Sequence, residues 1–147
     1  MRATLGDNLV SIVLFGSVAR GEAGSDSDLG LLVVCETLPP GRFARLRMLE
    51  PADEAFEKEL ESLHARGVHT RLSRVVKTRD EANRAVPLYL DLVEDARLLH
   101  DRGAFFAGVL ARLRATLAKH GAERLARGRV RYWLLKRDFR PGEVVDL

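Results

Sequence analysis

The chain has 147 residues, of which 46% are hydrophobic and 31% are charged, and its formal net charge is +3. These values are typical of one soluble globular domain, and so mild a positive charge does not by itself indicate a nucleic-acid partner. No apolar run is long enough to span a membrane, the N-terminus MRATLGDNLV lacks a signal-peptide pattern, and Cys35 is the only cysteine, so we expect a cytoplasmic protein without an intrachain disulfide.

The N-terminal part is predicted to contain two strands joined by a turn of small residues. Leu9–Phe15, with the sequence LVSIVLF, is apolar and rich in β-formers, and Gly16 ends this run. Asp28–Cys35 is the second expected strand. Residues 17–24 are predicted to form the turn, which could include one short helical turn. We expect the two strands to pair as neighbours.

The middle of the chain is predicted to be helical and then extended. Residues 43–66 have a helical pattern, although Pro51 is expected to divide this helix or to kink it. Gly67 is a plausible C-cap, and residues 68–76 form a third, more polar strand. Thr78, followed three residues later by Glu81, resembles a capping box that opens a short helix.

The last part of the chain is predicted to add two helices and two short strands. The expected elements are a helix over 87–94, a strand over 96–100, an amphipathic helix from about Phe106 to near Gly121, and a strand over 130–136. This order favours an α/β (α+β) fold with helices packed on a small mixed β-sheet. We expect a single domain over 1–147, with the motif-bearing core at 9–35 and a C-terminal helix and basic tail over about 103–147.

Two carboxylates stand one residue apart where the second strand begins. Asp26 and Asp28 would point to the same face, because side chains alternate along a strand. Two like charges at this distance repel unless a cation lies between them, and Mg²⁺ prefers oxygen ligands. The small Gly16-Ser17 turn upstream could approach a phosphate closely. These residues indicate a metal site beside a phosphate pocket, although an ordinary polar turn could have the same composition.

The full motif is more specific than this acidic pair. Between the two apolar strands the chain reads G-S-x-x-R-G-x-x-x-S-D-x-D-L, from Gly16 to Leu29. This pattern resembles the signature of the nucleotidyltransferases of the DNA polymerase β superfamily, and it is most similar to the small minimal nucleotidyltransferases (MNT type). The resemblance covers residues 9–35 at the level of the motif, and extends more loosely to about residue 100. It implies the nucleotidyltransferase-like fold.

The resemblance also implies a reaction and a role for each motif residue. A nucleoside monophosphate would pass from an NTP, expected to be ATP, to a hydroxyl of an acceptor, with Mg²⁺ as cofactor. The implied catalytic metal ligands are Asp26 and Asp28, and the implied nucleotide-binding residues are Gly16, Ser17, Arg20 and Ser25. Ser25 would cap the turn that orients the two aspartates. Arg20 could contact phosphate, but family members often use this arginine structurally.

One departure from the family pattern concerns a third carboxylate, which usually stands on the strand after the helix and completes a second metal site. Residues 68–76 contain no Asp or Glu, and the inward-facing position is expected at His69, Arg71 or Ser73. An arginine could supply positive charge there, but it cannot act as a base. The alternative function is therefore a catalytically weakened nucleotide-binding or protein-binding module.

The resemblance also suggests partners. Small members of the family often act as antitoxins and pair with a HEPN-domain ribonuclease, so a HEPN-type toxin protein is the implied acceptor. A homo-oligomer stays open. The segment 124–140 interleaves basic residues with Tyr132, Trp133 and Phe139, a composition that can bind RNA or an acidic protein surface. A solvated face with aromatic residues on the core is favoured over nucleic-acid binding.

Overall fold

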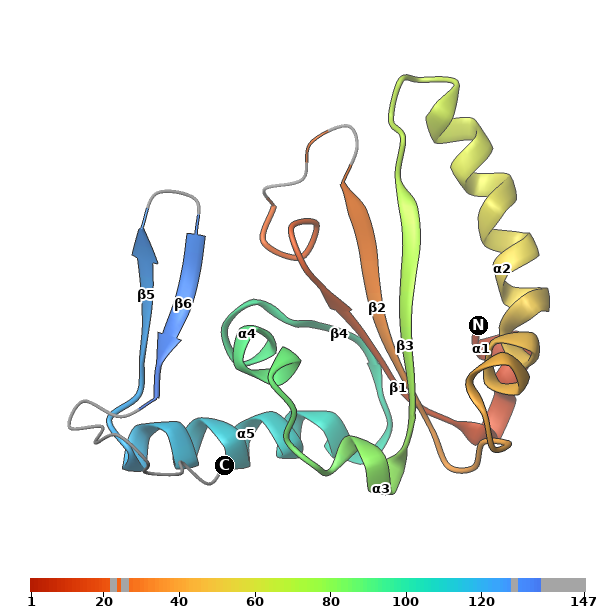
Figure 1. Ribbon diagram of the computed structural model, residues 1–147. Coiled ribbons are helices and arrows are strands. Elements are labelled where there is room, and N and C mark those ends of the chain that lie inside the picture. Colours follow the sequence, from red (N-terminus) through yellow and green to blue (C-terminus); the bar gives the residue numbers. More distant parts are fainter. Residues whose placement is uncertain (22–23, 25–26, 128–129, 136–147) are drawn as a thin grey trace.

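The computed structural model describes residues 1–147 apart from 22–23, 25–26, 128–129 and 136–147. In chain order its elements are α1 (Arg2–Leu5), the 3₁₀ helix η1 (Gly6–Asn8), β1 (Leu9–Phe15), β2 (Asp28–Cys35), α2 (Arg42–His64), β3 (Arg71–Thr78), α3 (Arg79–Ala82), α4 (Leu88–Asp95), β4 (Arg97–Asp101), the 3₁₀ helix η2 (Arg102–Ala104), α5 (Phe105–Lys119), β5 (Glu123–Arg127) and β6 (Val130–Leu134). Figure 1 shows a sheet with helices packed around it and a separate β5–β6 hairpin beyond the end of α5. Among the described residues, no helix combines the length and apolar character needed to cross a membrane.

The main sheet is mixed and has the strand order β3-β2-β1-β4. β2 pairs antiparallel with β1 and parallel with β3, while β4 pairs antiparallel with the other edge of β1. The bounds of β1 and β2 and their pairing confirm the sequence prediction. The pairing of Phe15 with Gly30 brings the end of β1 to the start of β2. The Gly16-Ser17 turn and the first residues of β2 therefore lie at the same end of the sheet.

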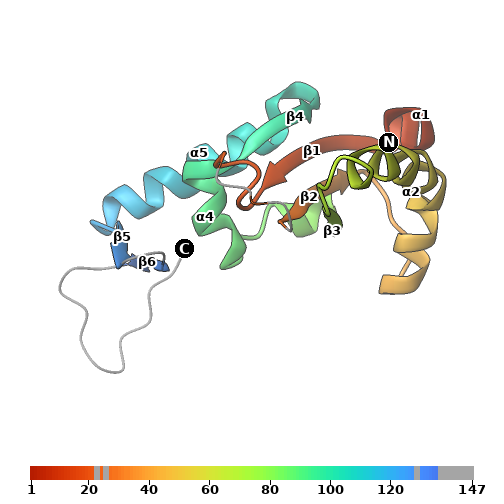
Figure 2. The same cartoon turned by 90° about the horizontal axis from the view of Figure 1, so that it is seen from above.

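Two apolar clusters cover the two faces of the sheet. Leu32 and Val34 belong to a core shared with α4 and α5, whereas Leu31 and Val33 belong to a core shared with α1 and α2. Consecutive residues of β2 thus alternate between two buried faces, which explains its continuous apolar sequence. Figure 2 shows the sheet from above, with α2 on one side and α4 and α5 on the other.

One predicted boundary in the middle of the chain is wrong, and one of the two alternatives for Pro51 is excluded. Pro51 does not divide the helical region, because α2 is one helix that contains it, while a kink at Pro51 stays a prediction. Pro51 is exposed, and the buried Leu49 and Leu60 hold both halves of α2 against the sheet. The third strand is β3, Arg71–Thr78, rather than 68–76. The amide of Val68 donates to the carbonyl of Leu63 at 3.0 Å and so closes the helix end instead of joining the sheet.

The capping box is confirmed: Thr78 accepts from the amide of Glu81, and the Glu81 side chain accepts from the amide of Thr78. Both predicted helices of the last part form, as α4 and α5, and the strand expected over 96–100 is β4. The strand predicted over 130–136 is β6. Its partner β5 was not predicted, because its sequence ERLAR is short and largely charged. Most of the basic tail lies outside the described residues.

Candidate nucleotide-binding site

The turn after β1 depends on the backbone conformation of Gly16. Gly16 has φ of +85°, a value that strains a residue with a side chain. A Cβ built there meets no atom within 4 Å, so the need for glycine is conformational rather than steric. The amide of Arg20 donates to the Gly16 carbonyl at 3.2 Å, which forms one helical turn, as the sequence allowed.

This turn leaves backbone donors available. Within the described residues, the amides of Ser17 and Val18 donate to no protein acceptor. The first amides of a helical turn have no partner within the turn itself, and such groups are suited to bind an anion. The backbone N–H groups of this turn and the Ser17 hydroxyl are therefore groups that can bind phosphate oxygens.

Arg20 lies beside Asp95, the last residue of α4. Its Nη1 is 3.7 Å from Asp95 Oδ2, and both side chains are largely buried. Arg124 of β5 donates two hydrogen bonds to the same carboxylate, at 3.0 and 2.5 Å. Hydrogen bonding from Arg124 is the main reason that the pKa of Asp95 is lowered, and the charge of Arg20 acts in the same direction. This geometry favours a structural role for Arg20.

Asp28 is exposed at the start of β2, at the same end of the sheet as the Gly16-Ser17 turn. The other two predicted residues of this segment, Ser25 and Asp26, lie outside the described residues. Ser27 was not predicted to take part in the site: its hydroxyl accepts a hydrogen bond from the Gly24 amide at 2.8 Å, directly before Asp28. A serine three residues after a glycine was the only sequence signal for this contact.

A second contact that the sequence did not predict lies below the turn. A Cβ at Gly30 would be 2.6 Å from Cε2 of Phe15, so the Phe15 ring packs where a side chain would otherwise stand. Phe15 directly precedes Gly16, and Gly30 is two residues after Asp28. The contact between Phe15 and Gly30 therefore fixes the position of the Gly16-Ser17 turn relative to the Asp28 carboxylate. The available signal was a glycine inside an otherwise apolar strand.

The register of β3 identifies the residues nearest to Asp28 on the neighbouring strand. Arg71 is paired with Asp28, and Ser73 is paired with Gly30. Both residues are exposed, and because paired residues of a sheet point to the same face, they share the face of Asp28. β3 contains no Asp or Glu. His69, the third position considered from the sequence, lies before β3 and outside the sheet.

The family model of the nucleotidyltransferase domain matches residues 3–101, which include the four strands of the main sheet. The chain belongs to the nucleotidyltransferase family. A protein of Methanocaldococcus jannaschii, named "Putative protein adenylyltransferase MJ1305", is 31% identical over 115 residues, which are 78% of this chain and 74% of that protein. The resemblance found in the sequence is confirmed, and the chain is assigned to the transferases.

Solved structures with a similar fold come from toxin–antitoxin systems. A toxin–antitoxin structure with AMP-PNP contains a chain that is 18% identical, with a TM-score of 0.49, over 81% of this chain and 88% of that chain. A structure of a tri-AMPylated Shewanella oneidensis HEPN toxin in complex with an MNT antitoxin contains one that is 14% identical, with a TM-score of 0.45, over 82% and 83% of the two chains.

Nucleotidyltransferases generally use a divalent metal, and the described carboxylate at this site is Asp28. Among the described residues, no three His, Cys, Asp or Glu side chains lie close enough together to hold a metal ion. A carboxylate that is exposed at a strand end, next to unpaired amides, is nevertheless the kind of ligand that a nucleotide-bound hard cation uses.

Proposed function

We propose that this protein is a Mg²⁺-dependent adenylyltransferase that transfers AMP from ATP to a hydroxyl of another protein. The observation that carries the proposal is the placement of Asp28 at the same end of the sheet as the Gly16-Ser17 turn with its unpaired amides. The relative named as a protein adenylyltransferase supports a protein acceptor. The HEPN-type toxin that the sequence suggests is the first acceptor to test, and binding to it would be consistent with an antitoxin role.

The chemistry divides between the two parts of the site. The acceptor oxygen forms a bond to the α-phosphorus of ATP, the bond from that phosphorus to the bridging oxygen breaks, and pyrophosphate leaves while the hydroxyl proton passes to water. The amides of the turn and the Ser17 hydroxyl bind phosphate oxygens. Asp26 and Asp28 would hold Mg²⁺, which neutralises charge that develops on the phosphates.

The lack of a carboxylate on β3 favours a second candidate function, that of a nucleotide-binding or protein-binding module with little turnover. Arg71 is paired with Asp28 on the strand where a third carboxylate is expected. An arginine stays protonated, so it cannot take the proton of the attacking hydroxyl. Binding of Mg²⁺–ATP and transfer of AMP must therefore be measured separately.

The experiment uses α-labelled ATP, Mg²⁺ and the protein encoded by the neighbouring gene. Wild type is expected to transfer label to that protein, whereas Asp26→Asn and Asp28→Asn lose transfer by roughly 10²-fold or more, because one metal ligand is removed. Asp80→Asn, on the exposed side of α3, is the matched control and keeps activity. Titration calorimetry with a non-hydrolysable ATP analogue measures binding in parallel.

The outcomes separate the two candidates. Transfer that depends on both aspartates supports the adenylyltransferase. Binding of the Mg²⁺–ATP analogue without any transfer supports the module, and unchanged transfer in both aspartate variants would exclude this site altogether.

We also propose that residues 1–147 form one nucleotidyltransferase domain, although the family model ends at residue 101. Trp133 and Leu135 pack against the core cluster of α4 and α5, and Arg124 is hydrogen-bonded to Asp95. The β5–β6 hairpin is thus attached to the same core as the main sheet.

A further inference from the structure

β3 presents a serine hydroxyl on the face of the sheet that carries Asp28. The register pairs Asp28 with Arg71 and Gly30 with Ser73, and the side chains of paired residues point to the same face. Ser73 is exposed, and its hydroxyl makes no hydrogen bond with any residue that the structure describes. A nucleophile that the described fold does not use therefore lies beside the candidate metal ligand.

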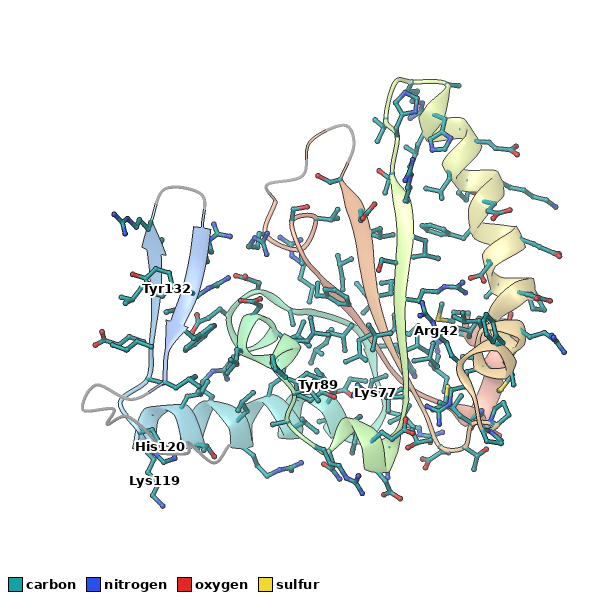
Figure 3. All side chains as sticks on the ribbon, viewed as in Figure 1. Arg42, Lys77, Tyr89, Lys119, His120 and Tyr132 are labelled. Atoms are coloured by element: carbon teal, nitrogen blue, oxygen red, sulfur yellow. The ribbon has the colours of Figure 1, made fainter. Side chains whose placement is uncertain are left out.

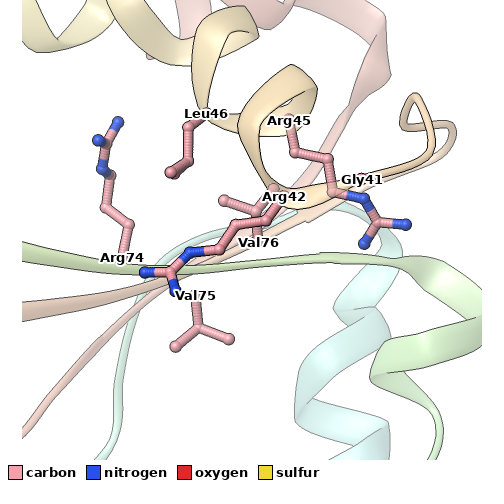
Figure 4. A pocket seen from close by; sticks show the side chains of 7 residues that line it. All are labelled: Gly41, Arg42, Arg45, Leu46, Arg74, Val75 and Val76. Carbon is pink, nitrogen blue, oxygen red and sulfur yellow. The ribbon is translucent and has the colours of Figure 1, made fainter.

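The alternation of side chains along β3 places Ser73 on the side of the sheet away from α2. Figure 4 shows Arg74 and Val76 directed towards α2, and Val75 directed to the opposite side of the strand. Val75 packs against the cluster shared with α4 and α5, whereas Val76 packs against the cluster shared with α2. Because Ser73 is two residues before Val75, both point to the same side. The ion pair between Arg74 and Asp53 belongs to the α2 side, so it does not fill the space between Ser73 and Asp28.

The spacing of the sheet leaves room for a phosphate group between these two side chains. Adjacent strands are about 4.8 Å apart and two residues along a strand span about 6.6 Å, so the Cα atoms of Asp28 and Ser73 are separated by roughly 8 Å. Asp28 and Ser73 also line one hollow of about 310 Å³, which Arg42 and Leu46 of α2 bound at the edge of β3. Two side chains that rise from one face at this separation can contact opposite sides of a single phosphate group.

A hydroxyl at this position also fits the lack of a carboxylate on β3. The strand that is expected to supply a third acid supplies Arg71 and Ser73 instead. Without a base on this strand, attack by the hydroxyl of another molecule is slow, because its proton must pass to water. A hydroxyl of the same chain has an advantage, since well-oriented intramolecular groups reach effective concentrations of about 10⁵ M or more. The charge of Arg71 can in addition stabilise negative charge on the transferred phosphate.

We propose that this enzyme transfers AMP to its own Ser73. This inference rests on the proposed function and adds an acceptor that belongs to the chain itself. Ser73 Oγ forms a bond to the α-phosphorus of ATP, and the bond from that phosphorus to the bridging oxygen breaks. Pyrophosphate leaves with the electron pair of that bond, and the hydroxyl proton passes to water. The product is a phosphodiester that joins AMP to Ser73, so each chain reacts once.

The experiment omits every other acceptor. The purified full chain is incubated with Mg²⁺ and α-labelled ATP, and mass spectrometry of the intact protein measures the AMP attached per chain, which should approach one. Cleavage after glutamate releases residues 62–81 as one fragment, in which fragmentation spectra assign the modified residue. The fraction of chains modified at a given time should not depend on protein concentration, because the acceptor and the site belong to the same chain.

Variants identify the acceptor residue. Ser73→Ala should reduce the label by roughly 10²-fold or more, whereas Ser73→Thr keeps a hydroxyl and should retain part of the label. Asp28→Asn should also remove the label, because a metal ligand is lost. Ser62→Ala, at an exposed position of α2 within the same fragment, is the matched control and should be labelled like wild type. Thermal unfolding distinguishes a lost acceptor from a lost fold.

The outcomes separate this inference from the proposed function. Transfer of AMP to the protein of the neighbouring gene by a chain that carries no AMP itself would overturn the inference and leave the proposed function intact. A normal amount of label in folded Ser73→Ala would also overturn it, as would a modified fraction that rises with protein concentration. Label on Ser73 without transfer to the neighbouring protein supports the inference and overturns the protein acceptor of the proposed function. Absence of any AMP transfer would overturn both.

Discussion

At the scale of single residues, the site depends on the contact between Phe15 and Gly30. β1 ends at Phe15, and its ring lies over the Cα of Gly30 on the neighbouring strand. Because Gly16 follows Phe15 directly, any movement of the ring also moves the Gly16-Ser17 turn. Gly16 itself is required for a different reason, since its φ is positive while the space around it is open.

Gly30→Ala is expected to destabilise the fold and to weaken nucleotide binding. The added Cβ would lie 2.6 Å from a Phe15 ring carbon, so the ring must move, at a cost of about 1–3 kcal/mol in the free energy of unfolding. Chemical denaturation measures the stability, and titration with an ATP analogue measures the binding.

The matched control is Gly108→Ala in α5. Its Cβ would meet Arg112 Nη1 at an ordinary 3.6 Å, so this variant should be as stable as wild type or more stable by about 0.5–1 kcal/mol. If Gly30→Ala were as stable as Gly108→Ala, the Phe15 contact would not constrain the site.

At the scale of elements, the capping box of α3 also fastens α2. Arg45 in the first turns of α2 donates two hydrogen bonds to the Glu81 carboxylate, at 2.7 and 2.8 Å. Glu81 in turn accepts from the Thr78 amide at 2.9 Å. One carboxylate therefore joins the start of α2 to the end of β3.

The Glu81 carboxylate makes the free energy of unfolding depend on pH in the acid range. The hydrogen bonds from Arg45, and then from Thr78, lower the pKa of Glu81 to about 2 from an ordinary value of 4.5. Because the pKa is lowered in the folded state, the contribution of Glu81 to stability is complete above about pH 4.5 and is lost as the pH falls towards 2. Wild type should therefore lose stability over this window more steeply than Glu81→Gln.

Thermal unfolding between pH 2 and pH 7 measures this difference. The gap between wild type and Glu81→Gln should be largest at neutral pH and should close as the pH approaches 2. Glu59→Gln, at an exposed position of α2, should follow the wild-type curve. A constant gap at every pH would show that the charge of Glu81 is not the cause.

At the scale of the whole molecule, Asp95 connects three parts that are distant in sequence. Its carboxylate forms ion pairs with Arg20, from the turn after β1, and with Arg124, from the β5–β6 hairpin, while Asp95 itself is the last residue of α4. The hairpin is therefore connected to the turn of the candidate site through the shared carboxylate of Asp95, although it lies outside the main sheet. Nearby, α4 is anchored by Tyr89, which packs edge-on to Phe106 at 5.4 Å and beneath Lys77 (Figure 3).

Arg124→Met should loosen the hairpin and destabilise the molecule by about 1–3 kcal/mol, because Asp95 loses two charge-assisted hydrogen bonds while it stays largely buried. Hydrogen exchange at the amides of β5 and β6 and thermal unfolding measure the two effects. Arg127→Met, at an exposed position of the same strand, should change neither. Unaltered exchange in Arg124→Met would show that the hairpin is held by its apolar contacts alone.

The sequence by itself determined the features that depend on neighbours along the chain. The bounds of β1 and β2, the capping box at Thr78, the amphipathic α5 and the family motif all follow from local periodicity, turn residues and spacing. The absence of an acid on the third strand was also visible, because it needs only the composition of that segment.

Only the tertiary structure decided which distant residues meet. The pairing of Arg71 with Asp28 depends on the register of two strands separated by all of α2, and the packing of Phe15 on Gly30 depends on the register of β1. The same holds for Arg20 and Arg124 on Asp95, and for β5, whose charged sequence becomes a strand through its partner and that ion pair. Register and ion pairing result from the packing of the whole chain, and no local pattern encodes them.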